Sequence, residues 1–243
     1  MFDAALRDRV QAAIAERAER DPRIAAAAVV GSLATGRADR WSDLDFAFGD
    51  TEEVSVSDVI GDWSRALASE FHATVLLDLR SGGAQYRVFL LPGCLQVDLS
   101  FASGGHVLQG SPRMRLLFGG TWPMQSAPQS PEDLFGWGVL YVRHAYVCLQ
   151  RQRWWQAAFC ITAVRNAAMD LACLARELPT RFGRAYDDLP TDLLAQLEAT
   201  NFASTSPDDL GRSFRAAVRC LIDQGASVSW AGDLRQDLLA LTR

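Results

Sequence analysis

The sequence contains no lysine: all 24 basic residues among its 243 are arginines. A Schiff-base enzyme, a Walker-type NTPase, a protein kinase and a lysyl-adenylate ligase each need a lysine amine, so none of these chemistries fits the chain. The 29 acidic residues give a net charge of −5, and neither half of the chain is basic. Because nucleic-acid binders usually carry a basic face, no nucleic-acid partner is expected.

Cysteine, histidine and long apolar runs are also scarce. The five cysteines are scattered without a Cys-x-x-Cys pair, which is typical of reduced core thiols in a cytoplasmic protein. The three histidines lie far apart and form no zinc-binding pattern. The apolar run 24–30 is far too short to cross a bilayer, and no basic region followed by a long apolar run opens the chain. The sequence therefore predicts a soluble cytoplasmic protein with no membrane partner.

The composition, 49% hydrophobic and 22% charged residues, is that of a globular protein large enough for one large or two small domains. The hydrophobic periodicity predicts that residues 1–120 form an α/β (α+β) domain and that residues 131–243 form an all-α helical-bundle domain. A segment rich in Gly, Pro, Ser and Gln, 119–131, is expected to link them. Helices are expected at 3–19, 55–70, 131–151, 154–177, 190–200, 206–223 and 232–242, and strands at 24–30, 43–48, 71–78, 84–91 and 95–101.

A group of polar residues after the first strand carries the most chemical information. That strand runs into Gly31 and Ser32, whose backbone can approach an anion closely, and residues 34–38 are expected to make a short helical turn. Asp43 and Asp45 follow two residues apart on a strand, which places both on one face. Such a pair is often only a turn and a cap, but two like charges this close favour a cation between them.

A third carboxylate, Asp98, lies on the polar side of a later alternating strand. Three aspartates from two strands beside a phosphate-binding turn predict a site for two Mg²⁺ ions and an in-line attack on phosphorus. Asp98 is expected either to bind the catalytic ion or to take the proton of the attacking hydroxyl.

Five further side chains are candidates for nucleotide binding. Ser32 and Ser42 have hydroxyls beside the motif, although Ser42 could equally cap a turn. Arg37 is expected to reach the triphosphate, as is the neighbouring Arg40, unless solvent surrounds them. If Pro92 and Gly93 form a two-residue turn, Arg87 lies opposite Asp98 and shares its face, where it would meet that carboxylate or the leaving phosphate.

Gly31-Ser32 followed by Asp43-Leu44-Asp45 resembles the signature of the DNA polymerase β-like nucleotidyltransferase superfamily. The resemblance covers residues 24–101 and implies a mixed sheet, nucleotide phosphates at Gly31 and Ser32, metal ions at the Asp pair, and Asp98 as the third acid. The helical half is more loosely similar to the aminoglycoside and lincosamide nucleotidyltransferase branch. That branch implies a role in antibiotic resistance and makes a homodimer plausible.

The resemblance implies transfer of a nucleoside monophosphate, AMP from ATP, to a hydroxyl of a small molecule with release of pyrophosphate. A cationic aminoglycoside would favour acidic walls such as Asp98, Asp170 or Asp187 would provide; a lincosamide or another metabolite fits no worse. Two alternatives remain open. One is a protein AMP-transferase of the antitoxin type, and the other is a nucleotide-binding protein without catalytic activity.

Overall fold

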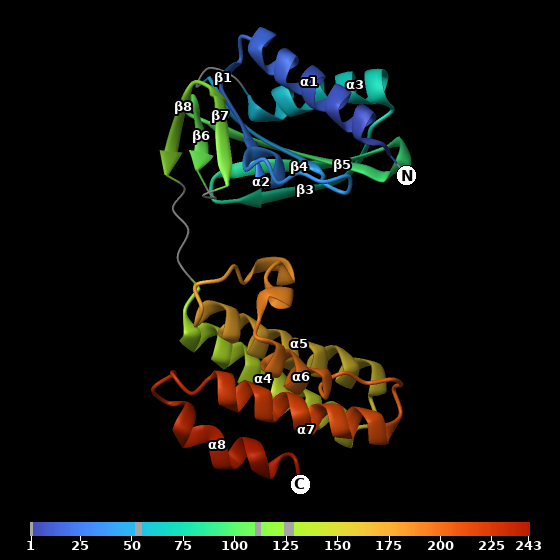
Figure 1. The fold of residues 1–243 in the computed structure, drawn as a ribbon, viewed down its shortest axis with the longest axis vertical. Coiled ribbons are helices and arrows are strands. Elements are labelled where there is room, and N and C mark those ends of the chain that lie inside the picture. Colours follow the sequence, from blue (N-terminus) through green and yellow to red (C-terminus); the bar gives the residue numbers. More distant parts are fainter. Residues whose placement is uncertain (1, 52–54, 110–112, 124–128) are drawn as a thin grey trace. The chain divides into compact units, whose positions relative to one another are not determined.

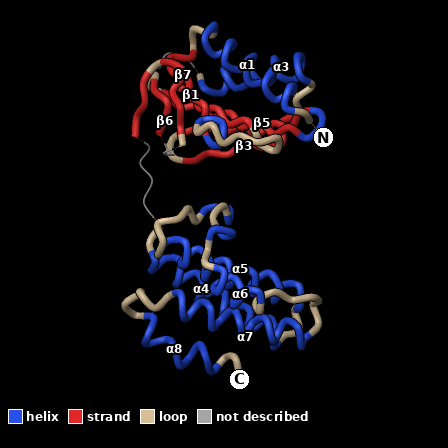
Figure 2. The backbone as a smooth tube through the Cα atoms, in the orientation of Figure 1, coloured by secondary structure: helices blue, strands red, loops and turns tan. Residues whose placement is uncertain are grey.

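The computed structural model describes residues 2–51, 55–109, 113–123 and 129–243. It divides into two compact units, Met1–Ala127 and Pro128–Arg243 (Figure 1). The first unit combines helices with a mixed sheet, and the described part of the second is helical (Figure 2). This is the fold class that the hydrophobic periodicity predicts.

The first unit is built around a six-stranded sheet in the order β3-β4-β5-β2-β1-β7. Strands β2 and β5 are parallel and their other neighbours are antiparallel, so the sheet is mixed. A parallel pair, β6 and β8, forms a separate two-stranded sheet. The elements are α1 (Ala4–Arg20), β1 (Ile24–Val30), α2 (Gly31–Ala34), β2 (Leu44–Asp50), α3 (Val56–Phe71), β3 (Thr74–Ser81), β4 (Ala84–Leu91), β5 (Leu95–Ser103), β6 (His106–Gln109), β7 (Met114–Phe118) and β8 (Gly120–Pro123).

Helices α1 and α3 cover one face of this sheet (Figure 1). Their apolar stripes pack on alternate residues of the central strands, because side chains of a strand alternate between its two faces. Phe48 of β2 and Phe101 of β5 both contact Trp63 of α3, with ring centroids 4.8 and 5.8 Å away. This helix-covered face therefore holds the main core of the unit.

Among the described residues of this unit, β6 covers part of the opposite face. Ala26 and Ala28 of β1 and Ala47 of β2 pack there with Val107 of β6. Gly49 allows the close approach: a Cβ at this position would lie 2.4 Å from the main chain of His106. We call this face of the main sheet, away from α1 and α3, the open face. Small residues thus let β6 cover the end of β2 where that strand finishes.

The second unit is a helical bundle whose helices begin and end close to their predicted limits. Helix α4 (Pro131–Gln150) begins where Ser130 accepts a hydrogen bond from the Asp133 amide at 3.0 Å and proline takes the first turn, as expected for a helix start. It is followed by α5 (Trp154–Leu174), α6 (Thr191–Glu198), α7 (Pro207–Gln224) and α8 (Ala231–Ala240).

Helix α5 is long and apolar enough to cross a membrane by length and composition. More than half of its apolar window is buried, however, and it supplies ten buried residues to the bundle. These features are those of the central helix of a folded bundle.

Three local predictions differ from the structure. The third strand begins at Thr74 instead of 71, because α3 continues to Phe71 and ends where His72 adopts a left-handed conformation with φ 55°. The short helical turn forms at Gly31–Ala34, earlier than the predicted 34–38. Within the predicted linker, Gly120–Pro123 is strand β8, and residues 124–128 lie outside the described residues.

Candidate active site

Two aspartates lie side by side on the open face. Asp45 of β2 and Asp98 of β5 are direct partners in the parallel pairing of these strands. The residues before and after each aspartate in its strand, such as Leu44 and Leu99, belong to the core beneath the helices. Because neighbouring side chains of a strand point to opposite faces, both carboxylates point away from that core. Both side chains are half-buried. The sequence prediction that Asp45 and Asp98 share a face agrees with this register.

Gly31 brings the backbone close to the first of these carboxylates. It follows Val30, the antiparallel partner of Asp45, and has φ +74°. A Cβ at Gly31 would lie 2.7 Å from Asp45 Oδ2. A larger residue would therefore meet both backbone strain and a clash with the carboxylate. Ser32, the next residue, is in the same short helix α2.

Asp43 lies immediately before β2 and is half-buried. Its position continues the alternation of the strand, but the strand pairing begins one residue later, at Leu44. Among the residues that the structure describes, no group of three or more His, Cys, Asp and Glu side chains is placed to hold a metal ion. The structure thus brings together two of the three predicted carboxylates and does not assemble a metal site from all three.

The remaining pair nevertheless suits magnesium. This ion is usually held by one or two carboxylates together with substrate phosphates, and not by a cage made of protein alone. Asp45 and Asp98 supply two hard oxygen donors from neighbouring strands. A site completed by the phosphates of a nucleotide is consistent with this arrangement.

Gln96 is a site residue to which sequence reasoning gave no role. Its side-chain amide donates to both oxygens of Asp98, at 3.0 and 3.1 Å. The sequence contains a signal for this contact, because Gln96 and Asp98 are two residues apart on one strand and such residues share a face. This contact holds the Asp98 carboxylate in place, which matters for any group that must receive a proton or bind an ion.

Ser42 has a structural role in the loop before β2. Its hydroxyl donates to Asp39 Oδ1 at 3.0 Å and accepts from the Asp39 amide at 2.9 Å. The Trp41 amide also donates to this carboxylate, and together these bonds hold the pKa of Asp39 below its usual value. The turn-capping alternative for Ser42 is therefore the one that agrees with the structure.

The two loop arginines differ in their contacts. Arg37 is exposed, and its amide donates to the Ser32 carbonyl at 3.0 Å, which ties it to the end of α2. The Arg40 guanidinium stacks over the ring of Trp41, 4.0 Å from its centre. Arg37 thus stays beside the predicted phosphate-binding turn, and Arg40 is held by an aromatic neighbour.

The prediction that Arg87 shares a face with Asp98 is wrong. The connection between β4 and β5 has three residues, Pro92–Cys94, so the partner of Asp98 is Val88 and that of Arg87 is Leu99. This shift by one residue moves Arg87 to the helix-covered face. There its guanidinium binds Asp78 through two hydrogen bonds of 2.6 and 2.7 Å and donates to Ser64 of α3 at 2.9 Å. The bidentate contact lowers the pKa of Asp78.

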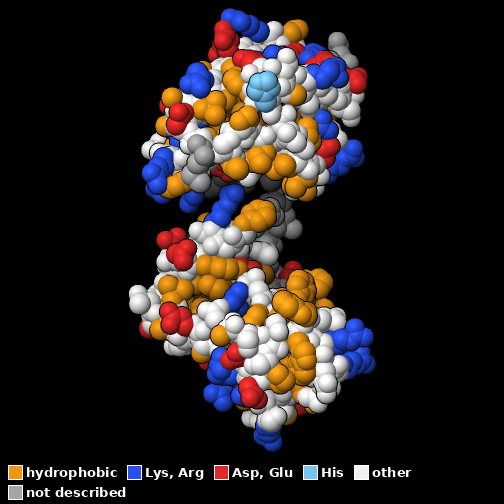
Figure 3. Space-filling view, turned by 90° about the vertical axis from the view of Figure 1, so that its right-hand side faces the viewer, with side chains coloured by type: hydrophobic (Ala, Val, Ile, Leu, Met, Phe, Trp, Pro, Cys, Tyr) orange, Lys and Arg blue, Asp and Glu red, His pale blue; other side chains and the backbone are white. Residues whose placement is uncertain are grey.

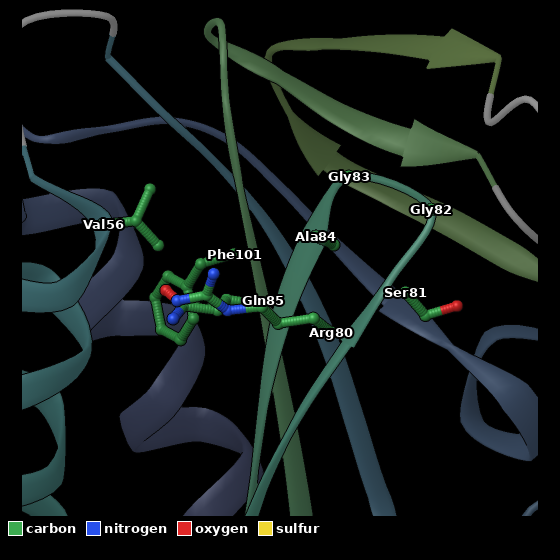
Figure 4. A pocket seen from close by; sticks show the side chains of 8 residues that line it. All are labelled: Val56, Arg80, Ser81, Gly82, Gly83, Ala84, Gln85 and Phe101. Carbon is green, nitrogen blue, oxygen red and sulfur yellow. The ribbon is translucent and has the colours of Figure 1, made fainter.

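A hollow of about 460 Å³ lies elsewhere, at the β3–β4 turn (Figure 4). Its lining includes Val56 of α3, Gln85 and Phe101. In Figure 4 the side chains of Arg80, Gln85 and Phe101 lie close together. Because Phe101 belongs to the core beneath the helices, this hollow opens on the face opposite Asp98.

Asp170, considered from the sequence as an acidic wall, is half-buried within the helical unit. Its carboxylate accepts a hydrogen bond of 2.9 Å from the Tyr186 hydroxyl. Burial raises the pKa of Asp170, and the hydrogen bond from Tyr186 opposes that rise. The contact joins α5 to the segment that follows it, which is a structural role for this side chain.

Comparisons with known proteins find similarity to solved structures. No protein-family model and no curated protein matches the chain. The chain is similar in structure to an aminoglycoside 6-adenyltransferase from Bacillus subtilis, with 10% sequence identity, 94% of each chain covered and a TM-score of 0.39.

Proposed function

We propose that the chain is a nucleotidyltransferase that transfers a nucleoside monophosphate, AMP from ATP in the first instance, to a hydroxyl of a small molecule. The observation that carries the proposal is the pairing of Asp45 and Asp98 in register on parallel strands, with the Gly31 backbone against the Asp45 carboxylate. Neighbouring carboxylates repel each other in the absence of a cation. Their position beside a glycine turn that can approach phosphates supports a magnesium–nucleotide site.

In this proposal Asp45 and Asp98 hold Mg²⁺, with Asp43 as a further ligand, and Gly31 and Ser32 bind the outer phosphates through the turn. Magnesium bound there would neutralise charge on the phosphates and favour ionisation of the acceptor hydroxyl. The proposal includes two Mg²⁺ ions, the number that the sequence predicts. Arg37, exposed beside the turn, is available for the phosphates.

The proposed reaction is an in-line displacement. The acceptor oxygen attacks the α-phosphorus and forms a new oxygen–phosphorus bond. The bond from this phosphorus to the oxygen that bridges to the β-phosphorus breaks, and pyrophosphate leaves with the electron pair. The acceptor proton passes to the Asp98 carboxylate, which Gln96 orients through its two hydrogen bonds, and then to water.

The test is pyrophosphate release from ATP, GTP, CTP and UTP with Mg²⁺, in the presence of aminoglycosides, lincosamides and neutral alcohols. We expect Asp45→Asn to reduce release by about 100-fold or more, because it removes one charge from the carboxylate pair. Asp58→Asn, an exposed position in the first turn of α3, is the matched control and should keep full activity. Equal turnover in Asp45→Asn and the wild type would refute the proposal.

Two other outcomes favour the alternatives. Labelled ATP that marks a protein band in a lysate points to protein AMP-transfer. Magnesium-dependent nucleotide binding without pyrophosphate release points to a nucleotide-binding protein that has no catalytic activity.

The five cysteines are free thiols, four of them buried, which supports a reducing compartment such as the cytoplasm.

A further inference from the structure

An apolar surface continues from the carboxylate pair toward one edge of the sheet. In β4, Val88 is the partner of Asp98, and in β3, Leu77 is the partner of Val88. The next row on the same face contains Tyr86 and its partner Leu79. Direct partners in neighbouring strands share a face, so these four side chains lie on the open face with Asp98. We call Leu77, Leu79, Tyr86 and Val88 the apolar platform.

The platform is accessible in the sheet unit. Leu77 is 45% exposed and Leu79 is 55% exposed, and β3 is an edge strand of the sheet. Figure 3 shows one face of the molecule, on which hydrophobic side chains of this unit reach the surface among charged ones. Adjacent strands lie about 4.8 Å apart, so Val88 lies about one strand spacing from Asp98 and Leu77 about two. That span is the size of a small-molecule ring or chain.

The platform lies on the side of the carboxylates away from the glycine turn. Gly31 adjoins Asp45 from the β1 side, whereas β4 and β3 follow β5 on the other side. An in-line displacement needs the attacking oxygen and the leaving pyrophosphate on opposite sides of the phosphorus. If the phosphates bind at Gly31, the acceptor hydroxyl must approach from the direction of Asp98 and the platform.

The charges on this side favour an acceptor without positive charge. Strands β3, β4 and β5 are fully described, and Asp98 is their only carboxylate on the open face. Asp78 of β3 points to the other face, where Arg87 neutralises it. Beyond Asp98, which the proposed magnesium site uses, these strands offer a polycationic acceptor no carboxylate, and such an acceptor would cover exposed leucine side chains.

We infer that the apolar platform binds the body of the acceptor, and that this acceptor is an uncharged molecule with an apolar ring or chain that presents a hydroxyl to Asp98. The inference rests on the proposed function and specifies its substrate class. It differs from a cationic aminoglycoside, which is one of the acceptors that the sequence resemblance leaves open. Leu77 and Leu79 are the residues that determine this specificity.

The experiment uses the full chain with Mg²⁺ and a non-transferable ATP analogue in which a methylene replaces the bridge between the α- and β-phosphates. A decanol that carries a photoreactive diazirine is the acceptor probe, and mass spectrometry locates its cross-links. We expect cross-links within residues 74–90. Kanamycin, a polycationic sugar, should not displace the probe at equal concentration.

The matched variants are Leu77→Asn and Leu116→Asn. Leu116 is 40% exposed on β7, the opposite edge strand of the same sheet. Removing one apolar side chain from the platform should reduce labelling about tenfold in Leu77→Asn. Leu116→Asn should label like the wild type. Calorimetric binding of the ATP analogue verifies that each variant is folded.

Each outcome decides a different claim. Failure of the ATP analogue to bind with Mg²⁺, or equal binding in Asp45→Asn, overturns the proposed function and the inference with it. Normal binding of the analogue with no label in 74–90 overturns only the inference, and shows that another part of the chain or a second copy covers the platform. Displacement of the probe by kanamycin, or equal labelling in both leucine variants, also overturns it.

Discussion

Replacing Asp50 with asparagine should stabilise the first unit at pH 8 and change its stability little at pH 5. Asp50 ends β2 on the helix-covered face, its side chain is fully buried, and neither carboxylate oxygen has a hydrogen-bond partner among the described residues. Burial raises the pKa of Asp50 to about 7; the nearby Asp21 adds to the rise and Arg23 opposes it. The folded protein therefore keeps a proton on this group in mildly acidic solution.

The sign and size of the effect follow from the two pKa values. In the unfolded chain an aspartate titrates near pH ~3.9, so between about pH 4 and 7 the folded state binds a proton that the unfolded state does not. The free energy of unfolding then falls as the pH rises through this range and is constant above it. At about 1.4 kcal/mol per pH unit, Asp50 alone removes roughly 2.5 kcal/mol between pH 5 and 8.

Asparagine has nearly the same shape and does not titrate, so the variant should lack this loss. Asp21, Asp62 and Asp78 do not interfere, because hydrogen bonds from arginines lower the pKa of each. The stability that these three carboxylates contribute is present above the pKa of an aspartate in the unfolded chain. It is lost in more acidic solution, below the pH range tested.

The assay is urea unfolding of the full chain at pH 5, 6, 7 and 8 for the wild type and Asp50→Asn. Hydrogen exchange of peptides that cover 44–50 assigns the change to the first unit. Asp50→Asn should gain on the wild type steadily from pH 5 to 7. A difference between the two proteins that is the same at pH 5 and pH 8 would refute the reasoning.

Two further predictions concern single contacts. Gly31→Ala places a methyl group 2.7 Å from Asp45 Oδ2 at a φ of +74°. Magnesium-dependent binding of the ATP analogue should therefore be lost, and the free energy of unfolding should fall by about 1 kcal/mol. Unchanged binding of the analogue by calorimetry would contradict the site. Tyr186→Phe removes the hydroxyl that donates to Asp170, so the pKa of Asp170 should rise further. The free energy of unfolding of the helical unit should fall by about 2 kcal/mol at pH 7. Carboxyl titration by NMR measures the pKa and urea unfolding measures the stability, and an unchanged pKa of Asp170 would count against the contact.

The strongly periodic elements were predictable because their local pattern agrees with their final environment. Helix α4 has a serine cap, a proline and acids at its start, and it begins where the sequence indicates. The strand that contains Asp98 alternates so strictly that its polar face could be identified without neighbours. Short strands such as β6 and β8 are supported by partners outside their own residues, and the sequence pattern did not identify them.

The errors at the candidate site come from register. The two-residue turn assumed at Pro92 and Gly93 has a third member, Cys94, whose left-handed φ of 66° lets the chain turn one residue later. A shift of one residue reverses the face of every side chain in a strand. Arg87 consequently belongs with Asp78 on the helix-covered face, and Val88 takes the place beside Asp98.

The sequence by itself determined the two-unit division into sheet and helices, the acidic character of the chain, and the side of its own strand on which each aspartate lies. These properties depend on residues close together in the chain, where periodicity and turn chemistry act directly. Only the tertiary structure decided which strands are neighbours, that Gln96 binds Asp98, and that Val88 lies beside Asp98. Strand order and register depend on packing between segments far apart in sequence, so local patterns do not encode them.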